Sequence, residues 1–220
     1  MADLSSVSGG FFGYDAVFEL VFALITLAVA FYSFKIYKLS DQKKSRIFGI
    51  AFLFISSSYF IQSLFNTSIF FELNEKFISL IEINNLLTIN ILSIFLHMVF
   101  FTVGIVTLIY MIAGGKNRFL YVISLIVILL SLFMSANKIY FFYILSSLLL
   151  IFIVAHYVTN YLEHKDNKSL TVLAAFLFLL VGHIQYIFIS SNTLYYVLGH
   201  ILELVAYSLI LINLVRIIKK

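Results

Sequence analysis

The sequence predicts an all-α membrane protein, a single domain over residues 1–220 that forms a seven-transmembrane-helix bundle. Three observations predict it. The chain is 63% hydrophobic and only 11% charged, which leaves too few polar side chains to cover a soluble domain. Its apolar residues fall into seven long runs, and its basic residues gather in the connectors at one side of these runs. We therefore expect a multi-pass protein of the cell (plasma) membrane.

Each apolar run is long enough to be a helix that crosses the bilayer, since about twenty residues span roughly 30 Å of hydrocarbon. Charges or turn residues bound every run. The shortest run is the fourth, and only Ala136-Asn137-Lys138 separates it from the fifth. We expect those two helices to form a tight antiparallel pair. The predicted helices cover residues 15–38, 46–70, 86–112, 119–136, 139–162, 169–190 and 194–216.

The basic residues predict the orientation of the bundle. Two of them, Lys76 and Lys138, fall on one side of the membrane, and twelve fall on the other. Basic connectors remain in the cytoplasm, so we expect an external N-terminus and a cytoplasmic C-terminus. Because the basic residues lie in short connectors, the net charge of +4 indicates topology and no nucleic-acid partner. The twelve are Lys35, Lys38, Lys43, Lys44, Arg46, Lys116, Arg118, Lys165, Lys168, Arg216, Lys219 and Lys220.

Two residue types are missing from the chain. It contains no cysteine, which excludes disulfides, thiolate metal sites and a cysteine nucleophile. It also contains no tryptophan, so we expect the 14 tyrosines to take the interfacial positions that both aromatic residues favour in membranes.

The last two runs, 169–190 and 194–216, carry the clearest candidate site. They form a hairpin, and each arm holds a Gly-His pair, Gly182-His183 and Gly199-His200, at a similar distance from the turn. The two imidazoles should therefore lie at one depth. Glu203 follows one turn after His200, and an ionisable residue inside a membrane helix is costly enough to indicate function. The glycines would admit a neighbouring backbone or a flat ligand.

Helical spacing adds residues from other runs to this candidate site. His97 shares one face of its run with Asn90, Glu19 lies on a polar face of the first run, and Tyr207 lies one turn beyond Glu203. All could face one cavity in the outer half of the bundle. The alternative is that these side chains only let helices pack and form hydrogen bonds. We assign His156, near the cytoplasmic end of its run, to the interface.

Three kinds of chemistry suit these residues. A zinc ion could bind His97, His183, His200 and Glu203, although the chain lacks the His-Glu-x-x-His signature of zinc proteases. A b-type haem could take His97 with His183 or His200 as its axial ligands. A hydrogen-bonded His and Glu cluster could instead sense protons or a small ligand. We favour this last interpretation, a non-enzymatic sensor or ligand-binding module, over a metal- or haem-binding membrane enzyme or redox protein.

The segment Leu198-Gly199-His200-Ile201-Leu202-Glu203-Leu204-Val205-Ala206-Tyr207 resembles the final helix of membrane sensor domains of the MASE type in prokaryotic histidine kinases. The segments Tyr14-Asp15-Ala16-Val17-Phe18-Glu19-Leu20 and Lys35-Ile36-Tyr37-Lys38-Leu39 are similar to small archaeal membrane proteins with seven helices. The resemblance covers about a quarter of the chain. It implies a sensor, and because no kinase or cyclase domain follows Lys220, we expect a cytoplasmic signalling partner or a homo-oligomer to supply the output.

Overall fold

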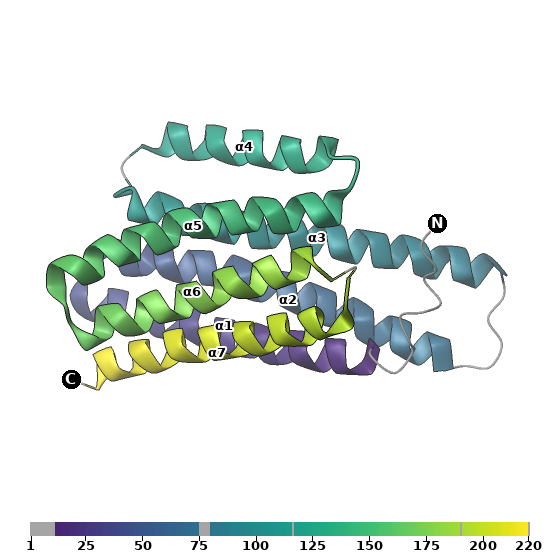
Figure 1. Ribbon diagram of the computed structural model, residues 1–220, viewed down its shortest axis with the longest axis horizontal. Coiled ribbons are helices and arrows are strands. Elements are labelled where there is room, and N and C mark those ends of the chain that lie inside the picture. The colour runs from purple at the N-terminus through teal and green to yellow at the C-terminus, as the bar shows by residue number, and fades with distance from the viewer. Residues whose placement is uncertain (1–11, 75–79, 116, 190, 220) are drawn as a thin grey trace.

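The structure, a computed structural model, describes residues 12–74, 80–115, 117–189 and 191–219. Every regular element in these ranges is an α-helix, and successive helices run in opposite directions (Figure 1). The predicted all-α bundle of seven helices is confirmed. The helices are α1 (Phe12–Ser40), α2 (Lys43–Asn74), α3 (Leu80–Ile112), α4 (Arg118–Met134), α5 (Lys138–His164), α6 (Asn167–Ile187) and α7 (Thr193–Ile218).

The helix boundaries follow local signals in the sequence. The side chains of Asn117, Asn137, Asp166 and Asn192 each accept a hydrogen bond from a backbone amide of the following first turn. Helices α2 and α3 are longer than predicted and extend beyond the other helices (Figure 1). No glycine or proline lies between Gly49 and Gly104 to end a helix, so helical structure continues past the apolar runs.

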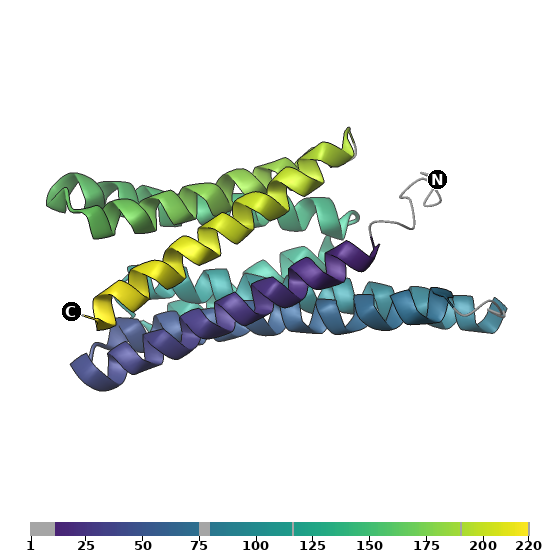
Figure 2. The same ribbon diagram turned by 90° about the horizontal axis from the view of Figure 1, so that it is seen from below.

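Six helices form a closed ring. Each packs on the next in the order α1, α2, α3, α5, α6 and α7, and α7 returns to α1. Figure 2 shows how α7 closes the ring, because it runs obliquely from α6 towards α1. We call the end of the ring with the α6–α7 connection the outer end. The end with the α1–α2 and α5–α6 connections is the inner end.

Helix α4 lies outside the ring. Among the described helices it contacts only α3 and α5, and Leu132 is its single buried residue. The predicted tight pairing of the fourth and fifth helices is therefore wrong. Their short connection brings two ends together, but α4 contains no glycine or alanine that would let a neighbouring backbone approach closely. Lipid is as apolar as its leucines, so burial alone does not drive packing in a membrane.

The outer surface of the ring is suited to lipid. Large apolar side chains such as Leu24, Phe31, Leu64 and Phe152 are more than half exposed. All helices except α4 are long and apolar enough to cross a membrane. The 17 residues of α4 extend about 25 Å, slightly less than the hydrocarbon thickness of roughly 30 Å. These features are those of a multi-pass membrane protein.

Candidate functional site

Five predicted site residues come together in the outer half of the ring. Glu19, His97, His183, His200 and Glu203 line one small cavity of about 40 Å³. They are contributed by α1, α3, α6 and α7, so the space lies inside the ring. Glu19, His183 and Glu203 are at most 3% exposed and His200 is 8% exposed, whereas His97 is partly buried. Water outside the protein therefore has little access to the first four.

The hydroxyl of Tyr186 joins the two arms of the hairpin. It donates to Oε2 of Glu203 over 3.2 Å and lies 2.9 Å from Nδ1 of His200. The tautomer of His200 decides which of the two atoms donates in the second bond. The other ring nitrogen, Nε2 of His200, is buried and has no hydrogen-bond partner among the described residues.

His183 occupies the other side of the same carboxyl group. Its Nδ1 lies 3.6 Å from Oε1 of Glu203 and 3.0 Å from the carbonyl oxygen of Leu179. A carbonyl oxygen can only accept, so Nδ1 carries the proton. The ring stacks on Phe101 with centroids 5.1 Å apart. Glu203 thus has an imidazole on each side. His200 is linked to it through the Tyr186 hydroxyl, and Nδ1 of His183 lies directly beside its carboxyl group.

His97 faces the same space from α3. Its ring packs on Phe101 and Tyr59, with centroid distances of 5.7 and 5.2 Å. Nδ1 of His97 is buried, and within the described part of the chain it has no hydrogen-bond partner. Two unpartnered imidazole nitrogens, on His97 and His200, therefore belong to residues that line one small cavity. A buried polar atom of this kind calls for a water, an ion or a proton.

Glu19 is held by α2. The side-chain amide of Asn66 lies 2.9 and 2.8 Å from the two carboxyl oxygens of Glu19. One turn earlier in α1, Asp15 is hydrogen-bonded to Tyr196 of α7. The two acidic residues of α1 are therefore tied to different neighbouring helices. They form a second polar layer next to the His and Glu cluster.

Two other predicted site residues do not line the cavity. Tyr207 is fully buried, and its hydroxyl lies 3.0 Å from that of Tyr59, which does line the cavity. Asn90 is partly buried in α3, two helical turns from His97. Tyr207 therefore joins the cluster through Tyr59 and through Phe22, which packs on His200, whereas Asn90 lies apart from the cluster.

The two glycines of the Gly-His pairs let α6 and α7 approach closely. A Cβ atom on Gly182 would lie 3.2 Å from the carbonyl oxygen of Gly199. One on Gly199 would lie 2.5 Å from the ring of Tyr186. The sequence left open whether these glycines admit a backbone or a flat ligand. The structure places a backbone and a tyrosine there.

The sequence analysis missed three tyrosines of the site. Tyr143, Tyr186 and Tyr196 line the cavity, although tyrosines were expected at the membrane interface. Helical spacing could have identified two of them, because Tyr186 follows His183 by three residues and Tyr196 precedes His200 by four. For Tyr186 and Tyr196, hydrogen bonding inside the ring outweighs the general preference of tyrosine for membrane interfaces.

Neither metal nor haem suits the residues as they are arranged. The described residues contain no group of three or more His, Asp and Glu side chains placed to hold a metal ion. The cavity of about 40 Å³ is far below the roughly 300–1,000 Å³ of small-molecule and cofactor sites. Phe101, stacked on both His97 and His183, occupies space that a haem would need between these ligands.

The chain was compared with protein families, curated proteins and solved structures. No family model, curated protein or solved structure matches it. The inference of a function therefore rests on the chemistry of the site.

Proposed function

We propose that the protein is a membrane sensor whose signal is the protonation of the His183, His200 and Glu203 cluster. The observation that carries the proposal is the chain His200–Tyr186–Glu203, with unpartnered imidazole nitrogens beside a very small cavity. A water needs about 10–15 Å³ of such space, so the cavity of about 40 Å³ has room for a few waters and no organic ligand. A proton needs no further room.

The cluster has two ways to hold a proton. Glu203 can be ionised beside a protonated histidine, or it can share the proton with a neutral ring. Histidine is the side chain whose charge changes between about pH 5 and 8, so environmental acidity can choose between these arrangements. The charged or titratable groups around the cluster are Asp15 and Glu19 on α1, Tyr59 on α2, His97 on α3, Tyr143 on α5, Tyr186 on α6 and Tyr196 on α7.

A change in protonation would act on the contact between α6 and α7. These helices provide all three cluster residues and Tyr186, at the place where Gly182 and Gly199 bring the backbones together. Because α7 runs on to the inner end beside α1 (Figure 2), a shift of α7 would reach that end. A cytoplasmic partner or a second copy of the chain could detect it there, in accord with the resemblance to kinase sensor domains.

The proposed sensor has its outer end outside the cell and crosses the membrane seven times, with α4 included. The basic bias of twelve residues against two supports this orientation. Single cysteines at Ser45, Lys76, Asn137 and Asn167 test it, since the chain has no cysteine of its own. A membrane-impermeant reagent should label positions 76 and 137 only. Labelling of 76 and 167 without 137 would contradict a crossing by α4, and labelling of 45 would contradict the orientation.

Infrared difference spectroscopy of the purified protein tests the proton site. A carboxyl band that titrates between about pH 5 and 8 should disappear in Glu203→Gln. The control is Glu163→Gln, which makes the same change at an exposed position near the inner end, and which should leave this band unchanged. A band insensitive to Glu203→Gln would contradict the proposal. Stoichiometric zinc or a Soret absorption in the purified protein would favour the metalloenzyme instead.

A further inference from the structure

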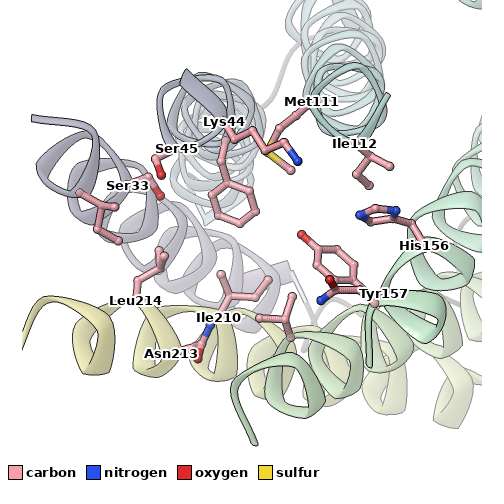
Figure 3. Close-up of a pocket in the computed structure, with 14 residues that line it drawn as sticks. Ser33, Lys44, Ser45, Met111, Ile112, His156, Tyr157, Ile210, Asn213 and Leu214 are labelled. Atoms are coloured by element: carbon pink, nitrogen blue, oxygen red, sulfur yellow. The ribbon is translucent and has the colours of Figure 1, made fainter. Parts of the chain in front are cut away.

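A second cavity, of about 270 Å³, lies at the inner end of the ring. All six ring helices contribute to its lining. Figure 3 shows Lys44 from α2 and His156 and Tyr157 from α5 around this space. It shares no lining residue with the outer cavity. A ligand here would be separate from the proton site, so this inference goes beyond the proposed function.

The polar lining of this inner pocket is basic or neutral. Lys44 and His156 supply two groups that can be positively charged, and none of the lining residues is aspartate or glutamate. Tyr157 and Asn213 add neutral hydrogen-bond donors. In Figure 3 the ammonium group of Lys44, the ring of His156 and the hydroxyl of Tyr157 point towards one central space. Glu163 interacts electrostatically with His156 from outside the lining, but the lining itself holds donors and no acidic residue, and such a set fits an anion.

The rest of the lining is apolar. Ile36, Phe48, Met111, Ile210 and Leu214 come from four different helices. Lys44 is the second residue of the apolar span Lys43–Ser68, so the pocket lies where a membrane would change from hydrocarbon to headgroups. Basic pockets between transmembrane helices at the cytoplasmic surface bind anionic lipid headgroups. The position thus favours a ligand with both an anionic and an apolar part.

We propose that the inner pocket binds a phosphate ester, with Lys44 and His156 donating to the phosphate oxygens and the apolar lining receiving the remainder. Two sources share this chemistry, the headgroup of an anionic phospholipid and a small soluble phosphate ester. His156, which the sequence analysis assigned to the interface, thereby acquires a binding role.

Thermal unfolding of the full chain in detergent tests the proposal with three probes. They are short-chain phosphatidylglycerol, the matching phosphatidylcholine and glycerol 3-phosphate. Titration with each probe gives its Kd from the rise in melting temperature. Lys44→Gln and His156→Gln should each weaken the binding of the phosphate ester about tenfold or more, as expected when a charge-assisted hydrogen bond is lost. Lys43→Gln is the matched control, since Lys43 is exposed and does not line the pocket.

Each outcome decides the proposal. Lys44-dependent binding of phosphatidylglycerol with no response to glycerol 3-phosphate identifies a lipid headgroup as the source. Lys44-dependent binding of glycerol 3-phosphate identifies a soluble ester. The proposal is overturned if no anionic probe binds, if phosphatidylcholine binds equally well, or if Lys43→Gln weakens binding as much as Lys44→Gln. These Kd values are measured at one fixed pH, whereas the proton sensor is tested by its carboxyl band, so the two proposals fail in different measurements.

Discussion

The outer cluster and the inner pocket are built from the same six helices but use polar residues differently. At the outer end, polar side chains bond to one another around about 40 Å³. At the inner end, polar side chains surround about 270 Å³. His183 lies four residues before the end of α6, and His200 and Glu203 lie seven and ten residues after the start of α7, whereas Lys44 is the second residue of α2. The difference shows that one ring can hold both a small site whose side chains bond to one another and a larger cavity.

The depth of each site explains this difference. A polar group in the hydrocarbon region needs a partner within the protein, so Glu203 is held by Tyr186 and His183. Near the headgroups, water and lipid phosphates can satisfy polar groups, and Lys44 can remain exposed. Substitutions should therefore affect folding at the outer cluster and ligand binding at the inner pocket.

The largest expected effect is that of Glu203→Leu. It would leave the buried Tyr186 hydroxyl without its acceptor and remove the carboxyl group beside Nδ1 of His183. Loss of one partner from a buried network should lower the free energy of unfolding by about 3 kcal/mol. Lys44→Leu at the inner pocket should change it by less than about 0.5 kcal/mol, as is usual for exposed positions. Equilibrium unfolding in detergent micelles measures both, and equal losses would remove the distinction between the two ends.

Pairs of substitutions sharpen this test. His183, His200 and Glu203 can be replaced singly and in pairs by Gln or Leu, and unfolding followed from about pH 5 to 8. We expect the double variants to depart from additivity by more than about 0.5 kcal/mol, since residues in one network are coupled. Additive losses for every pair would show that the three residues do not act as one cluster.

Gly199→Ala and Gly49→Ala compare packing at the two ends. The new Cβ atom would lie 2.5 Å from the Tyr186 ring at Gly199 and 3.0 Å from the Phe34 ring at Gly49. Two hydrogen bonds fix Tyr186, whereas Phe34 is only partly buried and can move aside. Gly199→Ala should lower the free energy of unfolding by about 1–3 kcal/mol and Gly49→Ala by less. A larger loss for Gly49→Ala in the same unfolding assay would contradict this account.

The sequence predicts the helices well because apolar length and capping residues are local. It also indicates His183, His200 and Glu203, because Gly-His pairs and a membrane glutamate can be found without knowing how helices pack. The position of α4 and the role of Tyr186 could not be predicted in this way. Both depend on which helix surfaces fit together. In a membrane, helices pack according to how closely their surfaces match in shape rather than according to hydrophobicity. The inner pocket could not be predicted from the sequence, because its lining residues are scattered over six helices.

Removal of one hydroxyl at each end should give the smallest effects. Tyr186→Phe deletes the bridge between His200 and Glu203, but Nδ1 of His200 already lies 3.9 Å from Oε2 of Glu203. A small movement would let these two bond directly, so the free energy of unfolding should fall by only about 1 kcal/mol. Tyr157→Phe removes a hydroxyl that faces the inner pocket (Figure 3), where water can replace it, and should have an effect below about 0.5 kcal/mol. Unfolding in detergent without added lipid measures the two. A greater loss for Tyr157→Phe would mean that the inner pocket, too, is held together by its own polar side chains.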